Sequence, residues 1–160
     1  DVPMERFSAP DDSFPSPNAV SRGDVVTFPI VTTIAAHYDA ISCDESLTED
    51  VIDIPVQALG GRNKRDFCAM KVKGDSMFPD YREGDVVLVL LQNTMNYSGQ
   101  IGVIAYGDGE MTLKRINFVM GEDWLELLPL NPQYPPKRIE GAELERCKVV
   151  GIPKLLIRKL

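Results

Sequence analysis

Short runs of β-branched and other apolar residues follow one another from residue 25 to the end of the chain, and most of them end at glycine, proline or aspartate. Runs of about four to eight such residues between turn formers are typical of β-strands. Gly107-Asp108-Gly109 separates two of the runs and predicts a hairpin between them. The expected strands are 25–31, 51–56, 67–72, 86–91, 101–106, 110–117, 124–128 and 148–157.

This succession predicts a mainly β fold, with largely antiparallel strands in a partly closed arrangement. Only 62–66 and 142–146 fit a turn or two of helix, so we expect one or two very short helices. Residues 1–24 are rich in proline and serine and lack apolar periodicity, which is typical of a flexible linker. We therefore expect a linker at 1–24 and one folded domain at 25–160, in a fragment of a longer protein.

The balance of charge argues against a nucleic-acid surface in this segment. The chain carries 17 basic and 24 acidic residues, a formal net charge of −7. Binding to phosphates needs clustered Lys and Arg side chains, and here they are scattered.

No apolar run approaches the roughly 20 residues that cross a bilayer, so no membrane partner is expected. Cys43, Cys68 and Cys147 are widely spaced, which favours free thiols in a reducing cytoplasm.

The motifs that are missing narrow the possible chemistry. His37 is the only histidine in the sequence. The sequence has no G-x-S-x-G nucleophile motif, no phosphate-binding G-x-x-x-x-G-K-[ST] motif and no zinc-binding H-E-x-x-H motif. We therefore predict no metal site and no organic cofactor.

The segment Lys73 to Pro79 is the best candidate for chemistry. It follows an expected strand, so Ser76 would lie on a loop at the edge of a sheet. Gly74 permits a tight turn, and Pro79 restricts the backbone after the serine. Backbone N–H groups around Ser76 could then form an oxyanion hole. An ordinary Gly-Asp-Ser turn is the alternative interpretation.

Lys114 is the candidate partner of that serine. Thr112, Lys114 and Ile116 share one face of an expected strand. If this face is buried, desolvation disfavours the ammonium and lowers the lysine pKa, and the neutral amine can accept a proton from Ser76. The alternative is that Arg115 faces inward and Lys114 faces water. The pattern of residues leaves both open.

Four blocks of sequence, in this order, resemble the LexA and phage-repressor peptidase family. They are Gly74 to Pro79, Glu83 to Val89, Thr112 to Ile116 and Leu127 to Pro132. The separation of Ser76 from Lys114 is also similar to that in the family. The resemblance covers nearly all of the expected domain and includes both residues of a Ser-Lys dyad.

The resemblance implies a mostly β fold and a domain that cuts its own backbone. Ser76 would be the nucleophile, and Lys114 the general base and then the general acid. The amides of Asp75 and Ser76 would hold the oxyanion. The scissile bond would be Ala36-His37, where the family usually has Ala-Gly. A glycine permits backbone angles that His37 obstructs, so cleavage could be slow, shifted to Ala35-Ala36, or lost.

The resemblance also implies partners. We expect a homodimer, with 149–157 as the candidate interface or, alternatively, an internal core strand. Operator DNA would be bound by a helix-turn-helix domain outside this chain. The trigger for SOS-type induction would be a RecA filament or a small antirepressor protein.

Other functions stay open from the sequence alone. One is a cleavage-deficient dimerisation and switch module, and another is a polymerase accessory protein of the UmuD type. A relative of the signal peptidases would need a membrane anchor, and no such segment is visible.

Overall fold

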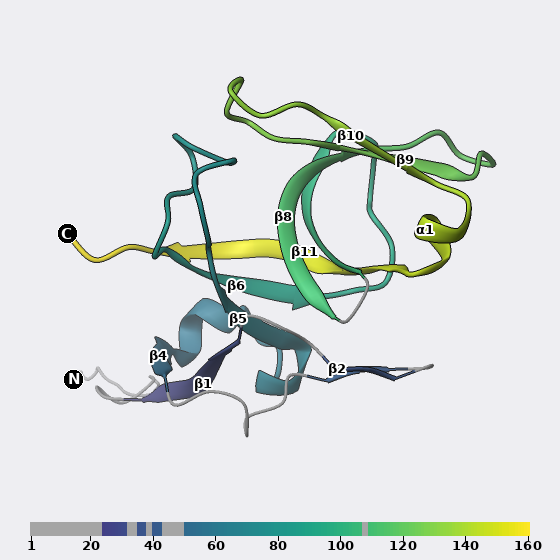
Figure 1. Cartoon of the computed structure of the whole chain (residues 1–160). Coiled ribbons are helices and arrows are strands. Elements are labelled where there is room, and N and C mark those ends of the chain that lie inside the picture. The colour runs from purple at the N-terminus through teal and green to yellow at the C-terminus, as the bar shows by residue number, and fades with distance from the viewer. Residues whose placement is uncertain (1–23, 32–34, 38–39, 43–49, 107–108) are drawn as a thin grey trace, which may run out of the picture.

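The computed structural model describes residues 24–31, 35–37, 40–42, 50–106 and 109–160, and these are mostly strands (Figure 1). The strands are β1 (Val25–Val31), β2 (Ala35–His37), β3 (Ala40–Ser42), β4 (Val51–Pro55), β5 (Phe67–Lys71), β6 (Val86–Leu91), β7 (Gln100–Tyr106), β8 (Glu110–Asn117), β9 (Trp124–Leu128), β10 (Lys137–Glu140) and β11 (Cys147–Ile157). In the described residues, the helical segments are the 3-10 turns Val56–Leu59 and Lys64–Asp66 and the short helix α1 (Ala142–Glu145). The prediction of a mainly β fold with very short helices is confirmed. Residues 1–23, predicted as linker, lie outside the described residues.

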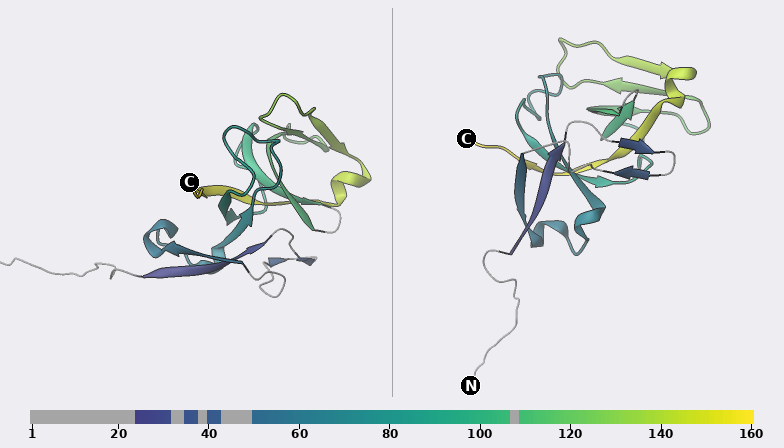
Figure 2. Two further views of the ribbon diagram at one scale, coloured as in Figure 1. Left: turned by 60° about the vertical axis from the view of Figure 1, so that its left-hand side comes forward. Right: turned by 60° about the horizontal axis from the view of Figure 1, so that its bottom comes forward.

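Nine of these strands form one open sheet, in the order β10-β9-β8-β7-β11-β6-β5-β1-β4. Neighbours are antiparallel except for β1 and β5, which are parallel. The strands β9 and β10 lie at one end of the molecule, and β1 and β4 at the other (Figure 2). β2 and β3 pair only with each other, in a separate two-stranded sheet.

The last strand of the chain lies near the middle of the large sheet. β11 pairs with β7 through its first half and with β6 through its second half, and Gly151 takes part in both ladders. The register shifts between Val149 and Gly151 on one side and between Pro153 and Leu155 on the other. The segment 149–157 is therefore a central strand, as one of the two sequence interpretations held. β11 joins the half of the sheet that contains β5 and β6 to the half that contains β7 and β8.

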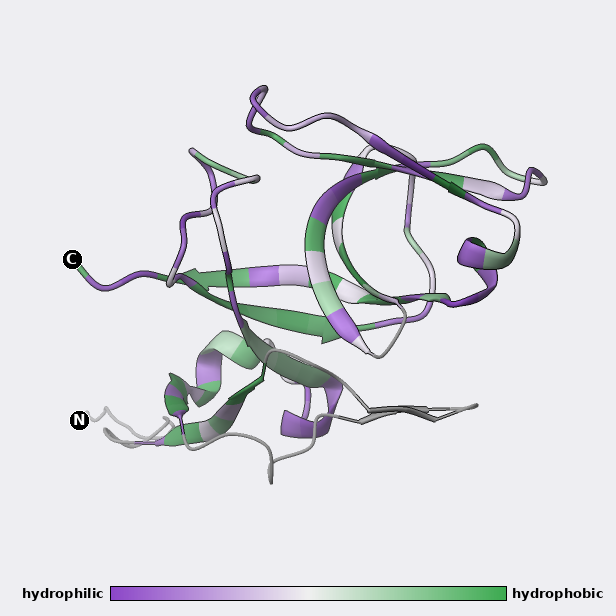
Figure 3. Cartoon of the chain, viewed as in Figure 1, coloured by the Kyte–Doolittle hydropathy of each residue, from purple (hydrophilic) through white to green (hydrophobic). Residues whose placement is uncertain are grey.

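Alternating side chains of the central strands fill separate cores. On β6, Val87 and Val89 pack into one core, while Leu88 and Leu90 pack into another on the opposite face. This strand is therefore buried on both faces, which explains its continuous apolar sequence (Figure 3). A third core, around Ile116, lies beneath β7 to β10.

Three of the strands were missed from the sequence, namely β10, β2 and β3. β10 carries only one buried residue, Ile139, so its sequence has no apolar alternation. The hairpin of β2 and β3 has strands of three residues each, which is shorter than a recognisable strand pattern.

Candidate functional site

Ser76 lies on the loop that joins β5 to β6. Backbone hydrogen bonds close the base of this loop, from Val72 N–H to the Asp85 carbonyl (2.8 Å) and from Gly84 N–H to the Val72 carbonyl (2.9 Å). Gly74 has a φ of 71°, a left-handed conformation that glycine adopts without strain. Met77, at 2% exposure, packs into the same core as Val87 and Val89. The loop is thus fixed on both sides of Ser76, which is itself half-buried.

Lys114 extends from β8 to this serine. Its Nζ lies 3.0 Å from Ser76 Oγ, within hydrogen-bond distance. Burial of the half-buried side chain lowers the pKa of the Lys114 amine below its ordinary value of 10.5. Arg115 is exposed. The alternative in which Arg115 faces inward and Lys114 faces water is therefore wrong.

Two further acceptors orient the lysine, and their role was not recognised from the sequence. Nζ donates hydrogen bonds to Thr112 Oγ1 (2.9 Å) and to the Leu113 carbonyl (3.2 Å). An ammonium has three N–H donors, which match these two oxygens and Ser76 Oγ. A neutral amine keeps two donors for Thr112 and Leu113, so its lone pair is directed at the Ser76 hydroxyl. The geometry therefore suits transfer of a proton from serine to lysine.

A surface hollow runs beside this pair of residues. Most of its lining side chains come from the end of β5, the Ser76 loop and the first half of β8, and apolar groups alternate with polar ones. They are Met70, Lys71, Val72, Lys73, Ser76, Met77, Glu110, Met111, Thr112, Leu113 and Lys114. An extended segment of chain could lie in this hollow with its backbone near Ser76 Oγ.

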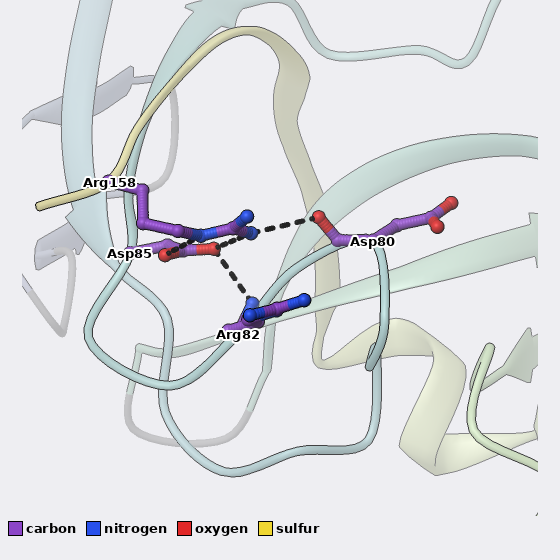
Figure 4. A network of polar contacts seen from close by, with 4 residues as sticks. All are labelled: Asp80, Arg82, Asp85 and Arg158. Atoms are coloured by element: carbon purple, nitrogen blue, oxygen red, sulfur yellow. Dashed lines mark hydrogen bonds and ion pairs between the residues drawn. The ribbon is translucent and has the colours of Figure 1, made fainter. Parts of the chain in front are cut away.

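A second cluster of polar groups holds the other end of the loop (Figure 4). Asp85 is only 2% exposed, and its carboxylate accepts hydrogen bonds from Arg158 Nε (2.9 Å), from Arg158 Nη2 (2.7 Å) and from the Arg82 backbone N–H (2.8 Å). Arg158 Nη2 also donates to the Asp80 carbonyl (3.4 Å). The residue that follows β11 is thereby tied to the loop that carries Ser76.

Replacing Asp85 with asparagine is expected to destabilise the fold by about 2 kcal/mol at neutral pH, because a charged hydrogen-bond acceptor is lost. Hydrogen bonds from Arg158, helped by the Arg82 N–H, hold the Asp85 pKa below its ordinary 3.8 despite burial. The stabilisation is therefore complete above the ordinary carboxyl pKa and is lost as the pH falls below it and through the lower pKa of the folded state. Urea denaturation at neutral and acid pH should show wild type and variant converging in acid. Asp80→Asn, an exposed carboxylate on the same loop, is the control and should change stability by less than about 0.5 kcal/mol. Equal stability of Asp85→Asn and wild type at neutral pH would contradict the assignment.

The predicted scissile bond lies within β2. Ala36 is paired with Ile41 and His37 with Ala40 in the two-stranded sheet. In the three views of Figures 1 and 2 this hairpin lies near the beginning of β8. It shares no ladder with β5 or β8. The roles predicted for the amides of Asp75 and Ser76 stay predictions.

Cys147 and Cys68 differ in their bonding. Cys147 is a free thiol whose pKa is raised by burial. Cys68, at 1% exposure, is disulfide-bonded, so the prediction of three free thiols is wrong for this residue. Cys43 lies outside the described residues.

Among the residues that the structure describes, no three His, Cys, Asp or Glu side chains are grouped so as to hold a metal ion. In the same residues no helix is long and apolar enough to span a bilayer.

An open β sheet that brings a loop serine to a half-buried strand lysine is an arrangement suited to serine peptidase chemistry without histidine. Comparison with known proteins agrees, since the sequence model described as Peptidase S24-like matches residues 29–153. The chain belongs to this family.

Its relatives include repressors named LexA. The chain is 30% identical over 136 residues to the LexA repressor of Clostridium tetani, covering 84% of this chain and 64% of the relative. It is 34% identical over 153 residues to that of Mycolicibacterium smegmatis, covering 95% and 54%. It is 45% identical over 87 residues to that of Citrifermentans bemidjiense, covering 52% and 41%. The matched segments span 41% to 64% of the length of these three relatives.

Proposed function

We propose that this chain is the self-cleaving regulatory domain of a LexA-like transcriptional repressor. The observation that carries the proposal is the 3.0 Å distance from Lys114 Nζ to Ser76 Oγ, together with the burial that lowers the lysine pKa. The substrate is the Ala36-His37 bond of the same chain.

In the first step, neutral Lys114 takes the proton of the Ser76 hydroxyl while Oγ attacks the Ala36 carbonyl carbon. Backbone N–H groups of Asp75 and Ser76 hold the negative oxygen of the tetrahedral intermediate. The intermediate then collapses, the C–N bond breaks, and the Lys114 ammonium gives its proton to the leaving amine of His37. Water, deprotonated by Lys114, finally hydrolyses the ester between Ala36 and Ser76.

The proposal extends to the whole repressor. The relatives' name supports a DNA-binding part outside this chain, a cytoplasmic location and self-association. The partner that triggers cleavage, a RecA filament or an antirepressor, stays a prediction.

Incubation of the purified chain at alkaline pH is expected to yield a fragment that begins at His37, because the lysine must lose its proton first. Intact mass and N-terminal sequencing identify the bond, and a rate that does not change with protein concentration shows that the reaction is intramolecular. Ser76→Ala should stay intact under the same conditions. Fragmentation of Ser76→Ala at the same bond would refute the role of Ser76.

His37 supports a second candidate, a switch and dimerisation module that has lost cleavage. His37 is the residue after the proposed scissile bond, and it lies within a paired strand. In this case the chain stays intact at alkaline pH and His37→Gly restores cleavage. Cleavage by the unaltered chain excludes this second candidate.

A further inference from the structure

One turn outside the Ser76 loop holds the backbone on both sides of Ser76. Asn131, three residues after the end of β9, is only 8% exposed. Its backbone N–H donates to the Ser76 carbonyl (3.0 Å), and its side-chain Nδ2 donates to the Asp75 carbonyl (3.0 Å). One buried residue therefore bonds both peptide groups that flank the Ser76 Cα.

The hydrogen bond at Asn131 Oδ1 fixes which way the side-chain amide of this residue is turned. Oδ1 accepts a hydrogen bond from the Gln133 backbone N–H (3.0 Å). Because an amide N–H can only donate, the oxygen of the side chain must face Gln133, and Nδ2 must face Asp75. A buried amide with both ends paired has little freedom to rotate.

These bonds determine where the Ser76 amide and hydroxyl point. In a trans peptide the carbonyl and the following N–H point in opposite directions. The Asp75 carbonyl accepts from Asn131 and also from the Phe78 N–H (3.1 Å), so the Ser76 N–H points away from both donors. Within the described part of the chain this N–H has no acceptor. It is available to a substrate oxygen.

The second bond fixes the plane that follows Ser76. Two fixed planes leave Ser76 with one pair of backbone dihedral angles, and these set the direction of its Cα–Cβ bond. The hydroxyl at the end of that bond is the one that lies 3.0 Å from Lys114 Nζ.

A neighbouring residue strengthens the same attachment. The Tyr134 hydroxyl donates to Asp75 Oδ1, and this bond raises the pKa of the Tyr134 phenol, which keeps the donor proton in place. The Tyr134 N–H donates to the Asn131 carbonyl (3.1 Å), so both residues belong to one turn.

We propose that Asn131 is a positioning residue for self-cleavage, which aligns the hydroxyl and the amide of Ser76 through the two flanking peptide groups. The inference rests on the proposed function, in which Ser76 is the nucleophile. Asn131 touches neither the scissile bond nor Lys114 in this role.

The test uses Asn131→Asp in the full chain. The variant keeps the size of the side chain and the acceptor for Gln133, and it removes the Nδ2 donor to the Asp75 carbonyl, which then keeps only the Phe78 N–H. The plateau rate of self-cleavage at alkaline pH is expected to fall about 10- to 100-fold, since a displacement of about 1 Å at a reacting group can cost 10²-fold. The midpoint of the pH–rate profile should not move, because the contacts of Lys114 come from β8 and Ser76. Gln133→Ala, which keeps the backbone N–H, is the matched control and should cleave at the wild-type rate.

A second measurement separates this inference from the proposed function. An alkyl fluorophosphonate phosphonylates an activated serine hydroxyl, as the Ser76 oxygen bonds phosphorus, fluoride leaves and Lys114 takes the proton. Labelling of Ser76 in wild type, slowed by the same factor in Asn131→Asp, supports positioning even if His37 prevents cleavage.

Wild-type rates of both reactions in a folded Asn131→Asp chain would overturn the inference and leave the proposed function standing. A lower melting temperature with unchanged rates below it would overturn it too, since it would indicate a structural role alone. Absence of both reactions in wild type would overturn the proposed function and this inference with it.

Discussion

Replacing Lys114 with alanine is expected to slow self-cleavage at Ala36-His37 by at least about 10³-fold, within the range for loss of a general base. Lys114 Nζ is the group that lies at 3.0 Å from Ser76 Oγ, and the only histidine of the chain is at the predicted scissile bond. An unaided serine hydroxyl is a weak nucleophile. Densitometry of cleavage at a fixed alkaline pH measures the effect. Arg115→Ala, the exposed neighbour, is the matched control and should leave the rate unchanged.

The rate of self-cleavage by the wild-type chain should increase with pH. Cleavage needs the neutral amine, so the rate rises with pH and levels off above the lysine pKa. Because burial lowers that pKa, the half-maximal rate is expected below the ordinary 10.5. Lys114→Arg should be inactive at every accessible pH, since a guanidinium keeps its proton. A Lys114→Ala chain that cleaves within tenfold of wild type would remove the lysine from the mechanism.

Substitution of Gly151 by alanine is expected to destabilise the fold by about 3 kcal/mol or more, the upper range for overpacking. A Cβ at this position of β11 would overlap the Leu90 carbonyl oxygen and would lie 2.8 Å from its carbon and 2.9 Å from Val89 Cγ1. The first two atoms belong to the backbone of β6, so no change of rotamer relieves the contact. The strand itself must move.

Gly102→Ala provides the comparison. A Cβ there would meet Met95 Cε at 2.7 Å and Sδ at 2.8 Å, the end of a flexible side chain that can shift. Its cost should be clearly smaller, about 1 kcal/mol. Urea denaturation of both variants measures the difference. Equal costs at the two positions would contradict the backbone contact at Gly151.

Sequence reasoning succeeded where the signal is local. The continuous apolar run of β6 and the glycine-rich turn before β8 predicted these strands, because burial on both faces and hairpin formation need only neighbouring residues. The resemblance of Gly74 to Pro79 and of Thr112 to Ile116 to a known family indicated the Ser76 and Lys114 pair.

Contacts between residues far apart in the chain could not be predicted from the sequence. Arg158 binds Asp85 across 73 positions, and Asn131 binds Asp75 across 56. Neither pairing can be deduced without the order of strands, which hydrophobic patterns do not specify. Thr112 and Lys114 are close in sequence and were expected on one face, but their hydrogen bond depends on the rotamers of both side chains, which a strand pattern does not specify.

The position of β11 has a consequence during protein synthesis. Ser76 belongs to the half of the sheet that contains β5 and β6, Lys114 to the half that contains β7 and β8, and the C-terminal strand pairs with both halves. A nascent chain that exposes Ser76, Lys114 and the proposed scissile segment but not yet β11 lacks the strand that joins the two halves. We expect such a chain to be protected from cutting itself until β11 has left the ribosome.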